Sequence, residues 1–368
     1  MAIVTGSVSI AVPEGWTAVS AVPVGAGASN DCIGTHDGTF HCDEALACAM
    51  LKMLPEYADW PVVRTRNEEE LAKCKVVVDV GAIYDPATLR LDHHQRTFHG
   101  TLEEEGFRTR LSSAGIVYKH FGRAVLKRII AGRVPDDMVD KVLYAKVYKN
   151  FMEHIDAIDN GIEVCADGDM PRYSISTHLS GRVAHLNPRW NEADGAAEAN
   201  ARFLRAMALT GGEFAEYVRG LAEGWWPARD MVAAALTKRR EAHPSGQARL
   251  LISNYCPWKS HLLDLEAEAA AAAAAAKIDS EAPILYVLYA DGGGTWRVQA
   301  VPESEDSFTS RLPLAAPWRG LRGAPLSAAA GIAGCTFVHA SGFIGGNETQ
   351  DGALAMAAAS IAMAESAA

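Results

Sequence analysis

The sequence lacks the cysteine patterns and the long apolar runs that mark several classes of protein. Its seven cysteines include no Cys-x-x-Cys pair. This argues against a disulfide framework or a cysteine zinc site and favours a reducing compartment. The alanine-rich run near residue 270 is flanked by Glu266, Glu268 and Lys277, which suits a surface helix better than a membrane span. We therefore expect no membrane partner.

Positive charge is also scarce. Lys and Arg number 34 against 45 Asp and Glu, which gives a formal net charge of −11. Proteins that wrap a long polyanion usually carry a basic stripe and a positive balance. If this chain handles nucleic acid, we expect it to hold a short stretch or an end, with metal ions supplying local positive charge.

Residues 1–29 contain neither Lys nor Arg. A secretory signal begins with basic residues and a mitochondrial transit peptide is usually rich in arginine, so neither pattern is present. We predict a loosely ordered extension with a strand near residues 7–12, and an unusual targeting peptide is the alternative. The rest of the chain is long enough for two domains. We predict them at 30–190 and 191–368, because the stretch after residue 186 is rich in turn residues.

Strand and helix patterns alternate in the first domain. Short apolar or alternating segments predict strands at 31–35, 61–63, 76–78 and 89–91. Helical patterns lie between and after them, at 43–53, 67–73, 112–122 and 136–163. Such alternation is typical of βαβ units. The predicted fold class is therefore α/β, with a parallel sheet in the N-terminal domain and a smaller α+β domain at the C-terminus.

The helical segment at 136–163 carries two neighbouring stripes. The apolar stripe, which should face the core, contains Phe151, Ile155, Ile158 and Ile162. Glu153, Asp156 and Asp159 follow one another three residues apart, so they stack along one side of the helix. This acidic stripe is either a solvated face or part of a metal site.

Ionisable residues follow three of the predicted strands, namely His36, Asp79 and the run Asp92-His93-His94. In parallel sheets, ligands lie beyond the carboxyl ends of the strands, so these side chains should meet at one edge. Carboxylate and imidazole ligands without thiolates suit Mn²⁺, and less well Zn²⁺, Fe²⁺ or Mg²⁺. A centre with two metal ions needs a bridging carboxylate, and Asp79 is the candidate.

The second domain begins with helical patterns, at about 195–242 and along the alanine-rich run. Strands should flank Asp291-Gly-Gly-Gly as a hairpin, and another should lie at 336–339. The latter enters a glycine-rich segment, 341–347, before a helix that runs to about residue 364. Free N–H groups at such a corner favour anions. The alternative is a tight connection that needs glycine for its flexibility.

Several side chains near this corner suit a phosphate or a base. Arg311, Arg319 and Arg322 could pair with phosphates, and His339 is a further contact candidate. Trp318 could stack on a base or belong to the core.

Separated motifs occur in order along the chain: THDGTFHCDE at 35–44, DVG at 79–81, DHHQ at 92–95, LSSAG at 111–115, EHIDAIDNG at 153–161, PWRGL at 317–321 and HASGFIGGN at 339–347. Together they resemble the DHH phosphoesterase superfamily and, more narrowly, the melanocyte-proliferating-gene family of exonucleases. The resemblance covers nearly everything from about residue 31 to 364.

The resemblance implies 3′-to-5′ RNA exonuclease activity and a centre of two Mn²⁺ ions, with Mg²⁺ or another divalent metal as alternatives. Carried over residue by residue, the metal ligands would be His36, His41, Asp43, Asp79, His93 and Asp156. His94 would lie against the scissile phosphate, with Asp92 orienting the histidines. The resemblance also favours substrate binding by the C-terminal domain, at Arg311, Arg319, His339, Ser341, Gly342, Gly345, Gly346 and Asn347.

The expected partner is an RNA or nucleotide 3′ end. A small-molecule phosphoesterase, acting on pyrophosphate, nucleotides or cyclic dinucleotides, fits the acidic charge equally well, and a non-catalytic binding protein is a third reading. The sequence leaves the oligomeric state open, a homodimer included. The resemblance suggests the nucleus and the mitochondrion, with the cytoplasm as the alternative.

Overall fold

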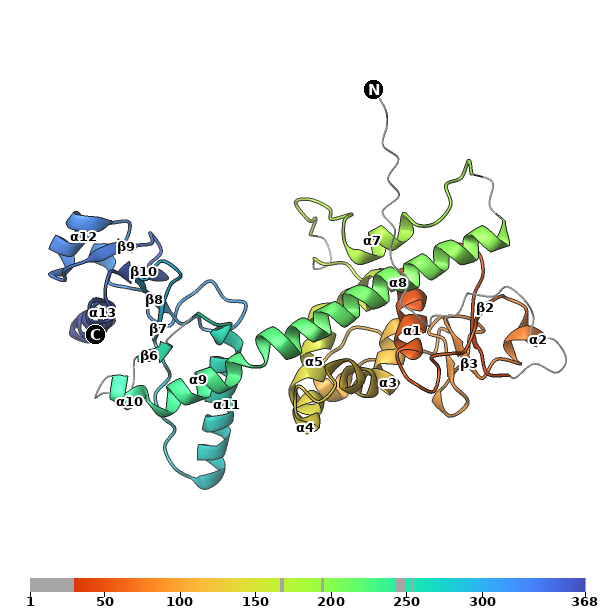
Figure 1. Ribbon diagram of the computed structural model, residues 1–368, viewed down its shortest axis with the longest axis horizontal. Helices are drawn as coiled ribbons and strands as arrows, with labels where there is room; N and C mark the ends of the chain where they lie inside the picture. Colours follow the sequence, from red (N-terminus) through yellow and green to blue (C-terminus); the bar gives the residue numbers. More distant parts are fainter. Residues whose placement is uncertain (1–29, 166–168, 193–194, 243–248, 253–254, 368) are drawn as a thin grey trace. The chain divides into compact units, whose positions relative to one another are not determined.

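The chain divides into two compact units, Met1–Ala222 and Glu223–Ala368. The computed structural model describes residues 30–165, 169–192, 195–242, 249–252 and 255–367 (Figure 1). The predicted N-terminal extension and its strand lie outside the described residues. Within the described part, every helix is too short or too polar to cross a lipid bilayer.

A five-stranded sheet in the order β2-β1-β3-β5-β4 forms the centre of the first unit. Its strands are β1 (Ile33–Thr35), β2 (Val62–Arg64), β3 (Val76–Val78), β4 (Tyr84–Asp85) and β5 (Arg90–Leu91). β1 pairs in parallel with β2 and β3, and β3 in parallel with β5, whereas β4 is antiparallel to β5. The three valines of β3 are buried, as in a strand covered on both faces. The prediction of an α/β fold with a mostly parallel sheet is confirmed.

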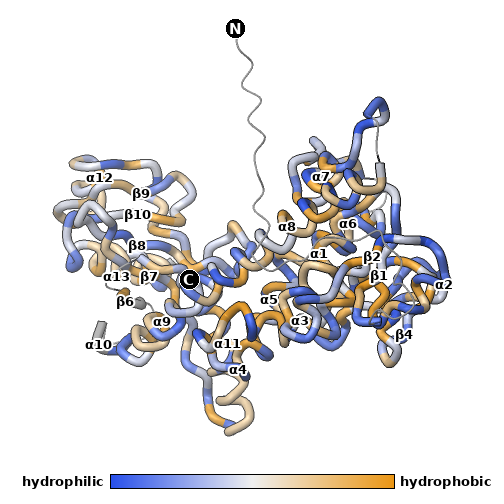
Figure 2. The backbone as a smooth tube through the Cα atoms, turned by 45° about the vertical axis from the view of Figure 1, so that its right-hand side comes forward, coloured by the Kyte–Doolittle hydropathy of each residue, from blue (hydrophilic) through white to orange (hydrophobic). Residues whose placement is uncertain are grey.

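The first unit also contains α-helices. They are α1 (Cys42–Lys52), α2 (Glu68–Leu71), α3 (Ser113–Ile130), α4 (Asp136–Met138), α5 (Tyr144–Val147), α6 (Glu153–Asp159), α7 (Leu179–Ala184) and α8 (Ala196–Gly220). Every residue of α1 is buried, and its small alanines allow α3 and α8 to pack closely against it. In Figure 2 the tube is hydrophobic near β1 and β2 and hydrophilic around α2, which carries three glutamates.

Helix α8 explains why the units separate later than the predicted boundary at 190/191. Its residues Phe203, Met207 and Phe214 are fully buried, and α8 contacts α1, α3 and α7 of the first unit. Phe203 meets Phe40 edge to face, with 5.6 Å between the ring centroids. The long green helix in Figure 1 therefore belongs with the N-terminal sheet, and the division follows it at residues 222/223.

The helical segment at 136–163 forms, but its faces differ from the prediction. Ile155 is buried, whereas Ile158 and Ile162 are 43% and 44% exposed. Two π-helical stretches, Val139–Leu143 and Tyr148–Met152, interrupt the segment. Each π turn shifts the phase of the side chains that follow, so a regular 3.6-residue period fails to locate the buried face. Ile162 also lies beyond the end of α6.

The second unit contains another five-stranded sheet, in the order β6-β7-β8-β10-β9. The strands are β6 (Arg249–Ile252), β7 (Tyr286–Ala290), β8 (Trp296–Ala300), β9 (Cys335–Val338) and β10 (Ile344–Asn347). The helices are α9 (Ala228–Thr237), α10 (Arg239–Ala242), α11 (Trp258–Ala276), α12 (Gly323–Ala330) and α13 (Gln350–Ala367). β7 and β8 pair as the predicted hairpin. Trp318 is fully buried among residues such as Leu314 and Tyr286, so it belongs to the core.

Candidate metal centre

Three parallel strands deliver ionisable side chains to one edge of the first sheet. His36 follows β1, Asp79 follows β3 and Asp92 follows β5, and the order β1-β3-β5 makes these strands neighbours. All three side chains are buried. Asp79 has a φ of 60°, in the left-handed region that non-glycine residues rarely adopt. Such a conformation often accompanies a functional constraint.

The first turn of α1 adds two carboxylates to the same edge. His41 is the N-cap residue, and its backbone N–H donates to the Glu44 carboxylate at 2.8 and 3.0 Å. Asp43 and Glu44 are both buried. Negative side chains are favoured at this end of a helix because the backbone N–H groups there are free and the helix dipole is positive. The His-x-Asp-Glu order at 41–44 therefore starts the helix and supplies ligands.

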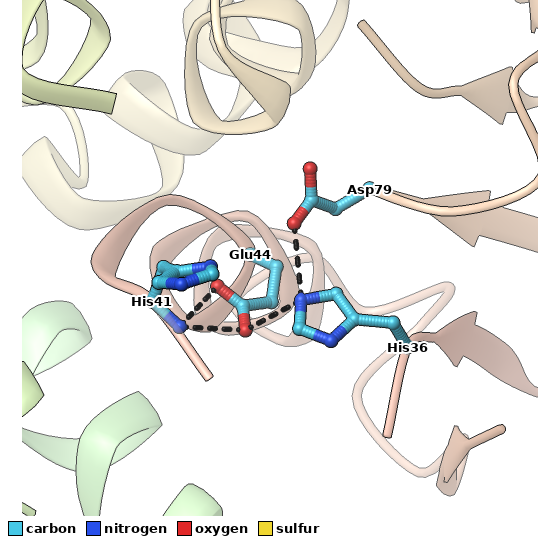
Figure 3. Close-up of side chains that lie close together, drawn as sticks. All are labelled: His36, His41, Glu44 and Asp79. Atoms are coloured by element: carbon cyan, nitrogen blue, oxygen red, sulfur yellow. Dashed lines mark hydrogen bonds and ion pairs between the residues drawn. The ribbon is translucent and has the colours of Figure 1, made fainter. Parts of the chain in front are cut away.

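His36, His41, Glu44 and Asp79 form the first group of candidate ligands, with one ligand atom of each lying within 4.8 Å of the others. The Nε2 atom of His36 lies 3.1 Å from Oε1 of Glu44 and 3.3 Å from Oδ2 of Asp79. Figure 3 shows Glu44 between the two histidines, with Asp79 approaching His36 from the end of its strand. Glu44 was missed as a ligand by the sequence analysis, although its position three residues after His41 was a usable signal.

His93 connects the remaining candidate ligands. Its Nε2 atom lies 3.3 Å from Oδ1 of Asp79 and 3.2 Å from Oδ2 of Asp159. Asp43 Oδ2 is 4.0 Å away. Two further groups result, one of Asp79, His93 and His94 and one of Asp43, His93 and Asp159. Since Oδ2 of Asp79 faces His36 and Oδ1 faces His93, this carboxylate links the first group to the others.

The donor set suits a divalent cation. Asp43 Oδ1 and His93 Nδ1 are buried and have no hydrogen-bond partner among the described residues, which is energetically unfavourable for polar atoms. Burial raises the pKa of Asp43, and the negative charges of Asp79 and Asp159 raise it further. Burial also raises the pKa of the neighbouring Cys42 to about 12, so its thiol stays protonated. Oxygen and imidazole ligands remain, a set that can hold a divalent cation.

Histidine protons partly balance the carboxylates when no cation does. Burial acts to lower the pKa of His36, but hydrogen bonds to Asp79 and Glu44 outweigh it and raise the pKa to about 10. Burial acts to raise the pKa of Asp79, but His36 and His93 lower it below its usual value. A proton and a metal ion compete for the same imidazole lone pair, so metal binding would release protons here.

Asp92 holds His94 in place. Its Oδ1 lies 2.7 Å from His94 Nδ1 and accepts a hydrogen bond from the His94 N–H, while Oδ2 accepts one from the N–H of Ala82. The hydrogen bond to Asp92 raises the pKa of His94. The His94 side chain is 59% exposed, whereas those of Asp92 and His93 are buried. The three residues of the DHH run therefore have different surroundings.

Asp156, predicted as a ligand, lies outside the three groups of candidate ligands. Its Oδ1 accepts hydrogen bonds from the Ser112 N–H and hydroxyl and from the Gly115 N–H, at 2.7 to 3.1 Å. Its Oδ2 accepts one from the Tyr148 hydroxyl at 2.8 Å. The carboxylate thus fixes the start of α3, and Asp159, one turn further along α6, faces His93 instead.

Two pockets open onto these groups. The larger, of about 460 Å³, is lined by Phe40, His41, Cys42, Asp43, Asp79, His93, His94, Arg110, Ile155, Ile158, Asp159, Asn160, Ser180 and Ala184. The second, of about 410 Å³, shares His41, Asp79 and His94 with it. Ile158, which the sequence pattern assigned to the core, thus lines the larger pocket. His41, Asp79 and His94 line both pockets, whereas Asp43, His93 and Asp159 line only the larger one and His36 only the second.

Most of the predicted substrate-binding residues of the second unit make hydrogen bonds or close packing contacts with other residues of that unit. Arg311 donates to the Ile284 carbonyl at 2.9 Å and lies 2.8 Å from the Glu266 carboxylate. The predicted glycine turn before α13 is instead strand β10, where Gly345 and Gly346 pair with β8 and β9. A Cβ at Gly346 would lie 2.6 Å from the Thr336 hydroxyl oxygen, so close strand packing explains this glycine.

Asn347 is fully buried and caps the turn into α13. Its Oδ1 accepts hydrogen bonds from the N–H and the hydroxyl of Thr349, and its amide nitrogen donates to the Ala333 carbonyl. Each of these bonds joins parts of the second unit. The side chain therefore has a structural role at this corner.

Arg319, His339 and Ser341 are exposed. Arg319 Nε donates to the Leu314 carbonyl at 2.9 Å, and His339 Nδ1 lies 2.9 Å from the Ser341 hydroxyl. Gly342 follows with a φ of 77°, and a Cβ there would lie 2.8 Å from Arg319 Nε, so this glycine is required for the close approach. These residues form an accessible polar surface on the second unit.

A family model described as "Uncharacterised protein family (UPF0160)", named for the MYG1 exonuclease, matches residues 32–361. The MYG1 exonuclease of Mus musculus is 50% identical over 334 residues, which cover 90% of this chain and 84% of that protein. The MYG1 exonuclease of Homo sapiens is also 50% identical, with 90% and 85% covered. The MYG1 protein of Dictyostelium discoideum is 43% identical over 88% of this chain and 94% of its own. No solved structure matches the chain.

Proposed function

The chain belongs to the MYG1 exonuclease family, and on that premise we propose that it is a metal-dependent nuclease that trims RNA stepwise from the 3′ end. The observation that carries the proposal is the linking position of Asp79, whose two oxygens face His36 and His93. A carboxylate shared by two groups of ligands is what a two-metal phosphodiesterase needs. A DHH-type relationship is part of the same proposal.

In this proposal two divalent cations, preferably Mn²⁺, occupy the candidate centre. One would be held by His36, His41, Glu44 and Asp79, and the other by Asp43, His93 and Asp159 together with Asp79. When bound, such ions neutralise charge on a phosphoryl group and make water more acidic. The protein's own contribution is a buried, acidic site that holds the ligands before the metal arrives.

His94 is suited to contact the substrate phosphate. It is exposed to both pockets, and Asp92 fixes its ring through Nδ1 and raises its pKa. A histidine held in this way has a fixed ring position, and its raised pKa favours the protonated form, whose positive charge attracts a phosphate. This assigns phosphate contact to His94 and its orientation to Asp92.

The exposed residues Arg319, His339 and Ser341 are the part of the second unit that we propose to grip the terminal nucleotide. Arginine can pair bidentately with a phosphate, and its Nη groups remain after Nε has bonded to the Leu314 carbonyl.

The family resemblance also underlies the proposed nuclear and mitochondrial location, which imaging of a fluorescent fusion would test.

Incubation of the purified protein and Mn²⁺ with end-labelled RNA tests the function. RNA labelled at its 5′ end should give a ladder of products that shorten one nucleotide at a time, whereas pyrophosphate and cyclic dinucleotides should be poor substrates. Asp79→Ala protein is the control for contaminating nucleases. Release of phosphate only from the small molecules would instead favour the small-molecule phosphoesterase, and cleavage of DNA but not RNA would refute the RNA assignment.

A further inference from the structure

Arg110 lines the larger pocket and is the single Arg or Lys among its lining residues. The same pocket holds the carboxylates of Asp43, Asp79 and Asp159. A phosphate ester that enters it therefore meets three carboxylates and one guanidinium. We propose that Arg110 binds the substrate's phosphate together with His94. This role rests on the proposed function.

The backbone and side chain of Arg110 are both fixed. Its carbonyl accepts a hydrogen bond from Asn160 Nδ2 at 3.0 Å, and its Nη2 donates to the His93 carbonyl at 2.5 Å. The guanidinium carbon lies 5.9 Å from the centroid of the buried Phe98 ring, a distance compatible with a cation–π contact. The guanidinium is therefore held in place before a ligand arrives, and little side-chain entropy is lost on binding.

The guanidinium nevertheless keeps unused donors. Its Nε atom is buried and has no hydrogen-bond partner among the described residues, and within them no carboxylate lies at ion-pair distance from Arg110. Buried donors without partners are rare in folded proteins, and an arginine kept only for packing usually satisfies them. Because Nε is buried while Arg110 lines the pocket, its Nη groups are the donors that can reach two oxygens of a phosphate.

Charge favours such a contact. The three carboxylates repel a phosphate anion when no cation is bound, and with cations bound the guanidinium still adds directional donors for the ester. The guanidinium of Arg110 supplies a positive charge to the pocket. In the same pocket, Ile155 and the half-exposed Ile158 offer an apolar surface to the organic part of the ester. The ligand class is thus a phosphate ester whose organic group tolerates apolar contact, such as a nucleotide.

The test compares full-length protein with Arg110→Gln and Arg110→Lys variants. Glutamine can still donate to the His93 carbonyl but carries no charge, and lysine keeps the charge without the paired donors. Arg108→Ala is the matched control, because Arg108 is exposed in the same loop and does not line the pocket. Adenosine monophosphate is titrated into each protein in the presence of saturating Mn²⁺ by calorimetry. Bound manganese is measured separately by mass spectrometry.

We expect Arg110→Gln to weaken the binding of adenosine monophosphate by roughly 10–100-fold, the usual range for a lost charge-assisted hydrogen bond. Arg110→Lys should lose less, and Arg108→Ala should bind like the wild type. Bound manganese should stay the same in all four proteins. A wild type that binds the nucleotide through Arg110 but cleaves no phosphodiester would refute the proposed function and support the phosphate role.

Three results would overturn the role of Arg110. One is unchanged nucleotide affinity in Arg110→Gln protein. Another is loss of manganese together with nucleotide, which would show that Arg110 acts by positioning His93. The third is a manganese-loaded wild type that does not bind adenosine monophosphate at all.

Discussion

Asp156 and Asp159 lie one helical turn apart on α6 and should respond oppositely to removal of the carboxylate. Asp156 is fully buried and accepts hydrogen bonds from four donors, provided by Ser112, Gly115 and Tyr148. Leaving a buried donor unsatisfied costs about 1–3 kcal/mol, and such losses are not fully additive. We therefore expect Asp156→Ala to lower the free energy of unfolding by roughly 3–5 kcal/mol.

Asp159 is partly exposed, and its carboxylate faces His93 at 3.2 Å. Removing it also relieves repulsion from Asp43 and Asp79, so metal-free Asp159→Ala protein should differ from wild type by less than about 1 kcal/mol. Its affinity for Mn²⁺ should fall by more than about 10–100-fold, the loss typical of changes further from a metal.

The assay is urea unfolding in the presence of a chelator, followed by measurement of bound metal after dialysis against Mn²⁺. Asp156→Ala should unfold at lower urea and keep its metal under conditions where it is folded. Asp159→Ala should show the reverse. If Asp156→Ala unfolds like the wild type but loses metal, while Asp159→Ala retains it, the ligand assignment by sequence is right and the one given by the structure is wrong.

Four further changes have defined outcomes. Asp79→Ala should abolish turnover and lower Mn²⁺ affinity by more than about 100-fold, and full activity would refute its linking role. Gly115→Ala would place a Cβ 2.3 Å from the Asp156 carboxylate and should lower the free energy of unfolding, measured in urea, by at least about 1–3 kcal/mol. Gly212→Ala is the control, because Gly212 lies on an open face of α8. It should leave the free energy of unfolding unchanged or raise it by up to about 1 kcal/mol. Saturating Mn²⁺ should raise the melting temperature, because a ligand at 100 times its Kd adds about 2.7 kcal/mol to the free energy of unfolding. An unchanged melting temperature would contradict the metal site. Burial raises the pKa of Asp156 to about 7, so between pH 4 and 7, about the range of the shift, the folded state keeps a proton that the unfolded state releases. The free energy of unfolding of the wild type should therefore fall over this pH range relative to that of Asp156→Asn protein. A difference between the two proteins that stays constant with pH would contradict this.

Arg319→Ala tests the second unit in the same way. It should weaken RNA binding and leave the bound metal unchanged, as measured by filter binding and metal analysis. Loss of metal in this variant would show that the two roles are not divided between the units as proposed.

Local patterns predicted much of the fold. The buried valines of β3 and the turn residues at 291–294 carry their signals within a few neighbours, and both the strand and the hairpin form. The position of His36, Asp79 and Asp92 at one sheet edge followed from parallel pairing, because the carboxyl ends of parallel strands coincide. These features depend on short-range sequence and on a general rule of topology, so the sequence alone determined them.

Contacts between distant segments decided the rest. Only the packing of α3 on α6 shows that Asp156 caps a helix and that Asp159 reaches His93, because π turns before α6 shift its faces. The local sequence predicts an anion-binding turn at glycines 345–346, whereas in the structure they pair with β8 and β9 and form part of a strand. The pocket that brings the Arg110 guanidinium together with three carboxylates likewise exists only after folding. Sequence spacing identified which residues could do chemistry, and tertiary packing decided which of them have atoms left for a ligand.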